Sequence, residues 1–214
     1  MKKLQLAIDD LEFREALRLT HALEEYIDII EMGSPFLMEY GMQAVREFKA
    51  AFPNKEVLAD LKIMDAGKYE AEIAFRAGAD YATVLGVTDT ATLIGCQEAA
   101  KQYGKKIYVD MICVQDIPKR LAEIENMGIF GVSVHTGVDQ QAKGITPLDD
   151  LNTMVAHRRE ANISVAGGIQ AETAGIYLHA GADVLICGGS LCHAEQPVEE
   201  AKKIVAIIKG GKSR

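Results

Sequence analysis

Short apolar runs alternate along the chain with longer segments in which apolar residues recur every three to four positions. Continuous runs of Val, Ile, Leu and Ala are typical of parallel strands covered on both faces, and the periodic segments are typical of amphipathic helices. Strands are predicted at residues 4–8, 27–30, 56–59, 81–85, 106–109, 131–134, 163–166 and 184–187. Helices are predicted at residues 11–23, 36–51, 68–76, 90–102, 117–126, 148–160, 172–179 and 198–209.

Glycines mark the ends of several predicted helices. Gly78 and Gly181 lie in identical Ala-Gly-Ala-Asp sequences between a helix and the next strand, and Gly104 and Gly128 occupy the same place in their units. Glycine just after the last helical turn adopts the left-handed conformation that ends a helix. These positions therefore support the alternation of helices and strands.

Eight strand–helix units with right-handed crossovers most simply close into a (β/α)8 TIM barrel, which belongs to the α/β class. An open doubly wound sheet is the alternative, but no G-x-G-x-x-G sequence follows the first strand. No linker or change of composition divides the chain. We therefore expect a single catalytic domain at residues 1–209 and a frayed tail at residues 210–214.

The composition narrows the range of partners. The chain has 214 residues and a net charge of -8, without a basic cluster, which argues against nucleic acid. No apolar run is long enough to cross a bilayer, and the sequence starts with a strand rather than a signal peptide. The four cysteines lack C-x-x-C spacing and are interpreted as reduced thiols. These features predict a cytoplasmic protein that has a small-molecule partner and no membrane contact.

Charged side chains stand where most of the predicted strands end. They are Asp9, Glu31, Asp60 with Lys62, Asp110 and His135. The carboxyl ends of barrel strands meet at one mouth, where substrates bind, so a common site is expected. Asp9, Asp65 and Asp110, each taken alone, are equally typical of helix N-caps. Glu31 fits that role poorly, because glutamate is a weak N-cap.

The acids at the mouth predict a bound cation. Asp60 and Lys62 are two residues apart, so in an extended strand they point the same way. Several carboxylates in one mouth repel one another, and the single charge of Lys62 does not balance them. Mg2+, with Mn2+ as the alternative ion, would do so with hard oxygen ligands, and Glu31 and Asp60 are the predicted ligands. A metal-free ion-pair network around Lys62 is the competing interpretation.

Two glycine pairs follow the last two predicted strands, namely Gly167-Gly168 and Gly188-Gly189. Barrels of this class frequently bind phosphate there through backbone N–H groups, although tight turns use the same residues. His135 ends the sixth strand. At a barrel mouth it is a candidate for proton transfer, and the alternative is a hydrogen-bonded core histidine.

Asp60, Lys62 and Asp65 form a D-x-K-x-x-D motif. Together with the acids that end the first two strands and the late glycine pairs, the motif resembles the orotidine-monophosphate decarboxylase superfamily of (β/α)8 barrels. Within that superfamily, the 3-hexulose-6-phosphate synthases resemble this chain in the segments LQLAID (4–9), DIIE (28–31), ADLKIMDAG (59–67), VHTGVDQQA (134–142) and VAGG (165–168). The match extends over nearly the whole chain.

The resemblance implies a Mg2+-dependent, reversible aldol condensation of formaldehyde with D-ribulose 5-phosphate, which gives D-arabino-hex-3-ulose 6-phosphate through a metal-stabilised enediolate. It implies that Lys62 adds a positive contact to the enediolate. His135 is implied to move the C1 proton or to protonate the formaldehyde oxygen, and Asp9 and Asp110 to orient substrate hydroxyls or the lysine. Asp65 is implied to reach into the site of a second subunit, which predicts a homodimer.

A related decarboxylase is the nearest alternative. 3-Keto-L-gulonate-6-phosphate decarboxylase shares the metal and lysine positions but carries Arg after its histidine and a Gly-Arg pair after the last strand. This chain has Thr136 and Val138 after His135, and it has Gly188-Gly189 after the last strand. Asp110 also stands where the decarboxylase has Glu. These departures favour the synthase, and a third interpretation is a non-catalytic barrel that binds a sugar phosphate.

Overall fold

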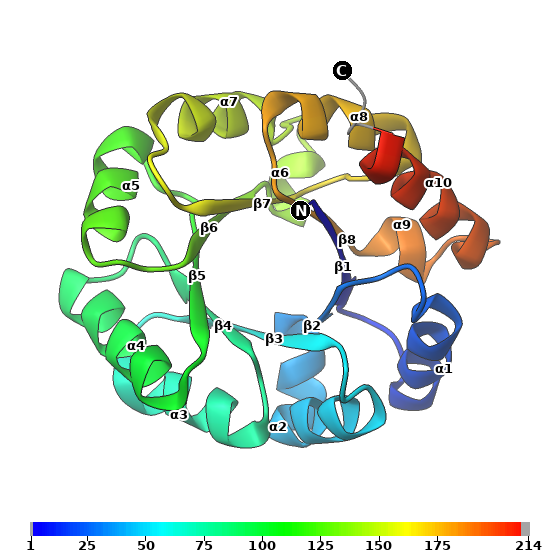
Figure 1. Cartoon of the computed structure of the whole chain (residues 1–214), viewed down its shortest axis with the longest axis horizontal. Coiled ribbons are helices and arrows are strands. Elements are labelled where there is room, and N and C mark those ends of the chain that lie inside the picture. Colours follow the sequence, from blue (N-terminus) through cyan, green and yellow to red (C-terminus); the bar gives the residue numbers. More distant parts are fainter. Residues whose placement is uncertain (1, 211–214) are drawn as a thin grey trace.

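The strands close into a barrel. The computed structural model describes residues 2–210, and its eight strands pair in parallel in the order β1 to β8, with β8 returning to β1. The helices form a ring around the strands (Figure 1). This arrangement confirms the predicted (β/α)8 barrel in a single domain.

The elements follow the predicted order. The strands are β1 (Lys3–Ile8), β2 (Ile29–Met32), β3 (Glu56–Ile63), β4 (Tyr81–Leu85), β5 (Lys106–Asp110), β6 (Gly131–His135), β7 (Asn162–Ala166) and β8 (Val184–Cys187). The helices are α1 (Phe13–Leu23), α2 (Ser34–Ala51), α3 (Gly67–Ala77), α4 (Thr90–Tyr103), α5 (Ile117–Asn126), α6 (Val138–Gln141), α7 (Leu148–His157), α8 (Ala171–Ala180), α9 (Gly189–Cys192) and α10 (Pro197–Gly210).

Several elements differ from the prediction, including strand β2, which begins at residue 29 rather than 27 and ends at residue 32 rather than 30. Helices α6 and α9 were not predicted, because each has only four residues and a segment that short shows no repeating pattern of apolar residues. Strand β3 continues to Ile63, beyond its predicted end at residue 59. Helix α10 includes Gly210, which was predicted to begin the tail, and the rest of that tail, residues 211–214, lies outside the described residues.

The two Ala-Gly-Ala-Asp sequences have the same structure. Gly78 and Gly181 end α3 and α8 with φ values of 103° and 111°, and the other two predicted helix-ending glycines also have positive φ. Asp80 and Asp183 each accept a hydrogen bond of 3.0 Å from the backbone N–H of the second residue of the preceding strand. The predicted helix ends are confirmed. Each aspartate links one strand, through a hydrogen bond, to the turn that precedes the next strand.

The barrel interior is apolar at its N-terminal end and polar above it. A buried cluster fills the first part and comprises Ile29, Leu58, Tyr81, Tyr108 and Val184. Because side chains alternate along a strand, the residues two positions further on also point inward. These residues are Glu31, Asp60, Thr83, Asp110 and Ile186, and all of them line one cavity. The apolar cluster thus forms the floor of a polar site.

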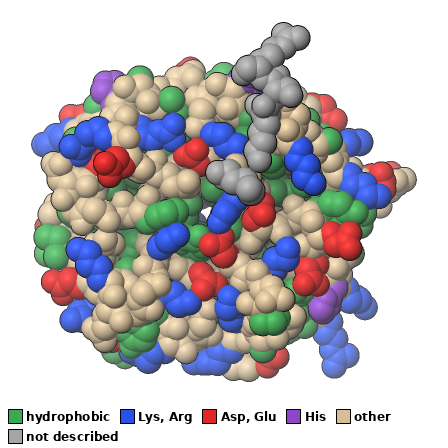
Figure 2. Space-filling model, in the orientation of Figure 1, with side chains coloured by type: hydrophobic (Ala, Val, Ile, Leu, Met, Phe, Trp, Pro, Cys, Tyr) green, Lys and Arg blue, Asp and Glu red, His purple; other side chains and the backbone are tan. Residues whose placement is uncertain are grey.

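Within residues 2–210, no helix is both long enough and apolar enough to span a bilayer. On the face seen in Figure 2, acidic and basic side chains are interspersed around the centre, and apolar side chains form only small groups. The described residues visible on that face therefore form no large apolar patch.

Candidate active site

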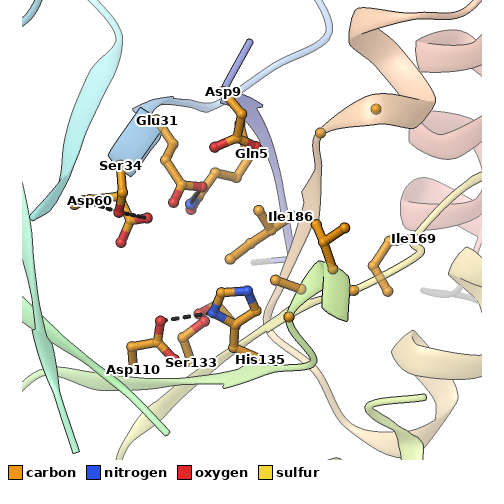
Figure 3. Close-up of a pocket in the computed structure, with 18 of the residues that line it drawn as sticks. Gln5, Asp9, Glu31, Ser34, Asp60, Asp110, Ser133, His135, Ile169 and Ile186 are labelled. Atoms are coloured by element: carbon orange, nitrogen blue, oxygen red, sulfur yellow. Dashed lines mark hydrogen bonds and ion pairs between the residues drawn. The ribbon is translucent and has the colours of Figure 1, made fainter. Parts of the chain in front are cut away.

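A cavity of about 950 Å³ opens at the C-terminal ends of the strands. Its lining includes all but one of the predicted site residues, namely Asp9, Glu31, Asp60, Lys62, Asp110, His135, Gly167, Gly168, Gly188 and Gly189. The lining also includes polar side chains that were not assigned to the site from the sequence, among them Gln5, Ser34 and Thr83. Figure 3 shows the acids and the imidazole directed from different strands into the same space.

Strand β3 changes its pairing at the D-x-K motif. From Ala59 to Ile63 the strand advances four residues while the paired positions of β4 advance two. Lys62, within this bulge, has a positive φ of 48°, which is uncommon for a residue with a side chain. Asp60 and Lys62 nevertheless both line the cavity, which confirms their predicted common orientation, although a bulge rather than a regular strand produces it.

Asp60 is buried and all its oxygens are engaged. Thr83 Oγ1 donates to Asp60 Oδ1 over 2.8 Å, and Ser34 Oγ lies 2.9 Å from Oδ2. The Lys62 ammonium forms an ion pair with the same Oδ2. Burial disfavours the charged amine, but the charges of Asp60 and Asp110 outweigh burial and raise the pKa of Lys62 above its usual value. Lys62 is therefore a cation at neutral pH.

His135 and Asp110 form a second pair. His135 Nδ1 lies 2.8 Å from Asp110 Oδ2, and Lys62 Nζ lies 3.8 Å from the same oxygen. Burial opposes protonation of His135, but its hydrogen bond and attraction to Asp110 outweigh burial and raise the imidazole pKa. Burial likewise opposes ionisation of Asp110, yet the same hydrogen bond lowers its pKa. The pair therefore favours an imidazolium beside a carboxylate.

The carboxyl groups of Glu31 and Asp9, unlike that of Asp110, have raised pKa values. Burial, and then the charge of Asp60, raise the pKa of Glu31 to about 8, and the same two causes raise the pKa of Asp9. Gln5 Nε2 donates to Glu31 Oε2 over 2.7 Å, but Gln5 Oε1 is buried without a hydrogen-bond partner among the described residues. Asp9 packs so closely on Gly33 that a Cβ there would lie 2.0 Å from Asp9 Oδ1. Within residues 2–210, neither of these two carboxyl groups forms an ion pair with a basic side chain, although the charge of Lys62 acts on both.

The donor set suits a divalent cation with hard oxygen ligands. Glu31 and Asp60 come from neighbouring strands and face the same space (Figure 3). A cation near them would offset the effects of burial and of the Asp60 charge on Glu31, and Gln5 Oε1 could accept a hydrogen bond from a water of that cation. Within residues 2–210, no three His, Cys, Asp or Glu side chains gather about a common point. A cation here would therefore have few protein ligands.

The glycine pairs line the part of the cavity formed by β7 and β8. Gly167 and Gly168 have φ values of 123° and 68°, which favour glycine, and a Cβ at Gly167 would lie 2.9 Å from the carbonyl oxygen of Thr136. Gly188 and Gly189 follow β8 and line the same cavity. Figure 3 shows Ile169 and Ile186 on this side of the cavity, away from Asp60. The cavity thus has a charged side and a side of exposed backbone.

Asp65 is the predicted site residue that the cavity does not include. Its side chain is exposed, and its Oδ1 accepts a hydrogen bond of 2.7 Å from the backbone N–H of Ala66. The residues at the N-cap positions of α1, α3 and α5 are Glu12, Ala66 and Asp116. The alternative interpretation of Asp9, Asp65 and Asp110 as N-caps is therefore wrong.

Comparison with known proteins identifies the family of the chain. A model of the orotidine 5'-phosphate decarboxylase / HUMPS family matches residues 2–204. A Bacillus subtilis (strain 168) protein named 3-hexulose-6-phosphate synthase is 44% identical over 209 residues, which are 98% of this chain and 100% of that protein.

Solved structures give the same result. The structure of 3-hexulose-6-phosphate synthase from Salmonella typhimurium matches with a TM-score of 0.95 and 49% identity, over 97% of this chain and 99% of that one. That of 3-keto-L-gulonate-6-phosphate decarboxylase from Vibrio cholerae matches with a TM-score of 0.87 and 25% identity, over 98% and 99%. The chain therefore belongs to the orotidine 5'-phosphate decarboxylase / HUMPS family, and within it to the group of the 3-hexulose-6-phosphate synthases.

Proposed function

We propose that the chain is an aldehyde-lyase, a 3-hexulose-6-phosphate synthase, which condenses formaldehyde with D-ribulose 5-phosphate and catalyses the reverse cleavage. The observation that carries this proposal is the identity of 44% and 49% to two proteins of that name over nearly their full lengths. The likeness to the decarboxylase of Vibrio cholerae has 25% identity and is the weaker of the two.

The condensation defines what the site must supply. The C1 proton of ribulose 5-phosphate leaves, and the resulting enediolate attacks the formaldehyde carbon to form the new C–C bond. The formaldehyde oxygen then carries the negative charge and takes up a proton. The reaction therefore requires a group that exchanges protons and positive charge close to the enediolate oxygens.

His135 is our candidate for the proton transfers. Its Nδ1 is hydrogen-bonded to Asp110 over 2.8 Å, so the ring is held in one orientation and the second ring nitrogen is directed into the cavity (Figure 3). The neutral imidazole accepts the C1 proton, and the imidazolium that Asp110 stabilises donates it to the formaldehyde oxygen. One residue thereby serves both halves of the reaction.

Positive charge for the enediolate would come from two sources. Glu31 and Asp60 would hold Mg2+, or Mn2+, which supplies Lewis-acid stabilisation of developing negative charge when bound. Lys62 adds its ammonium group, kept protonated by Asp60 and Asp110. Asp9 lines the same part of the cavity and would orient a substrate hydroxyl.

The substrate phosphate would lie at the glycine pairs. Gly167, Gly168, Gly188 and Gly189 leave main-chain groups uncovered at the cavity wall. Backbone N–H groups bind an anion without adding positive side chains to an acidic protein. The reacting end of the substrate would then face Lys62 and the acids across the cavity.

A homodimer would give Asp65 a role. Asp65 is exposed and lies outside its own cavity, at the start of α3. Apolar side chains are exposed around the same helices, including Met38 on α2, Met64 before α3, Tyr69 on α3 and Ile94 on α4. A second subunit covering them would remove apolar surface from water and would bring each Asp65 towards the neighbouring site.

The free thiols support a proposal for the compartment. All four cysteines are unpaired. Free thiols are typical of a reducing environment, so we propose that the protein acts in the cytoplasm. Fractionation of the cells that make it tests this location.

The decisive assay measures formaldehyde-dependent loss of ribulose 5-phosphate with EDTA and after readdition of Mg2+. We expect EDTA to abolish the loss and Mg2+ to restore it. Full turnover in EDTA would contradict the roles of Glu31 and Asp60. Faster release of CO2 from 3-keto-L-gulonate 6-phosphate would favour the decarboxylase instead. Thermal stabilisation by the sugar phosphates without turnover of either would mean a non-catalytic binding barrel.

A further inference from the structure

Thr83 stands opposite the bulge that carries the motif lysine. It lies on β4, in the inward layer of the cavity, and is buried. The bulge spans the part of β3 between Ala59 and Ile63, and over this part the regular pairing with β4 is interrupted. A backbone N–H in an interrupted ladder needs another acceptor, because an unpaired buried group is unfavourable.

The Thr83 hydroxyl is that acceptor, and the directions of its two hydrogen bonds are fixed. The backbone N–H of Lys62 donates to Thr83 Oγ1 over 2.9 Å. An amide N–H can only donate, so the hydroxyl accepts this bond and must direct its single hydrogen elsewhere. That hydrogen goes to Asp60 Oδ1, 2.8 Å away. One hydroxyl therefore joins the lysine backbone to the carboxylate two residues earlier.

Two consequences follow for the reacting groups. Lys62 keeps its uncommon positive φ of 48°, since the bond to Thr83 satisfies the N–H that this conformation withdraws from the sheet. Asp60 has Oδ1 occupied by Thr83, which leaves Oδ2 facing the ammonium of Lys62. The hydroxyl thus fixes the backbone position from which the Lys62 side chain extends. It also determines which carboxylate oxygen of Asp60 faces the Lys62 ammonium.

We infer that Thr83 is a positioning residue, which holds Lys62 and Asp60 in their working geometry without touching the substrate. The inference rests on the proposed function for its kinetic part and on hydrogen bonding alone for its structural part. A displacement of about 1 Å at reacting groups lowers rates by about 100-fold, whereas substrate affinity depends on the whole cavity. Loss of the hydroxyl should therefore lower kcat far more than it raises KM.

The test compares Thr83→Val, which keeps the shape, with Thr83→Ser, which keeps the hydroxyl. Thr83→Val should lower kcat by about 10- to 100-fold and change KM for ribulose 5-phosphate by less than about threefold, and Thr83→Ser should keep most of kcat. The matched control is Thr20→Val on α1, which removes a buried hydroxyl bonded to the carbonyl oxygen of Ala16. Its kcat should stay within about twofold of the unmodified protein.

A second measurement does not depend on activity. The amide hydrogen of Lys62, followed by NMR, should exchange with solvent at least about tenfold faster in Thr83→Val than in the unmodified protein, and not in Thr20→Val. Thr83→Ala serves if the valine variant does not fold. Unchanged exchange, or a serine variant as slow as the valine variant, would overturn the inference. Absence of activity in the unmodified protein would instead refute the proposed function and leave the exchange result to decide.

Discussion

Binding of Mg2+ in the cavity should release protons, and the number released should depend on the pKa of Glu31. Burial, and then the charge of Asp60, raise the pKa of Glu31 to about 8. At pH 7 a carboxyl with this pKa is about 90% protonated, and a carboxylate must lose its proton to bind a metal. Each site should therefore release about 0.9 proton at pH 7 and about 0.1 proton at pH 9. The affinity should rise about tenfold per pH unit and level off above pH 8.

Calorimetric titration in buffers of different ionisation enthalpy measures this release, with Mn2+ as a second probe ion. Asp149→Asn on α7 is the matched control, because Asp149 is an exposed acid outside the cavity and should leave the release unchanged. Glu31→Gln should weaken binding and remove its pH dependence. Tight binding at pH 7 with less than about 0.2 proton released, and with one affinity from pH 6 to 8, would refute the reasoning.

Three further predictions test other parts of the chain. Asp110→Asn should lower the pKa of His135, measured by NMR, by about one to two units, because a charge-assisted hydrogen bond contributes about 1.5–3 kcal/mol; an unchanged pKa would contradict the pairing. Mixing inactive Asp65→Asn and Lys62→Ala proteins should restore about a quarter of the activity through mixed dimers with one intact site, and no recovery after verified subunit exchange would mean that sites are not shared. Asp80 accepts hydrogen bonds from two lysines and a backbone N–H, which lower its pKa against the effect of burial. Asp80→Asn should therefore lower the free energy of unfolding by about 1–2 kcal/mol at pH 7 in urea, and the difference should shrink as the pH falls through that lowered pKa.

The fold could be predicted because its signals are local. Parallel strands covered on both faces appear as continuous apolar runs, and the glycines at positions 78 and 181 end their helices with the positive φ that their place predicted. The repeated order of strand and helix then leaves few topologies. The short helices α6 and α9 escaped prediction, since four residues complete little more than one turn.

The candidate site could be predicted only in part, because its hydrogen bonds depend on strand register. The acids at strand ends were visible in the sequence. The contacts from Thr83 to Lys62 and Asp60 join residues 21 and 23 positions apart and arise only once a bulge has formed. Gln5 left a signal that was overlooked, a polar residue at an inward position of an otherwise apolar strand.

The distribution of charge argues for a cation beside Glu31 rather than for ion pairs alone. A network around Lys62 accounts for Asp60, which it contacts, and for Asp110, which also binds the histidine of β6. It does not account for Glu31 and Asp9, whose pKa values are raised by burial and by the charge of Asp60. A protein that needed only stability would be better served by a neutral side chain at Glu31, which is 8% exposed. A buried glutamate that lies near another acid and forms no ion pair within residues 2–210 is expected where a divalent ion completes the site, which is why we propose Mg2+ there.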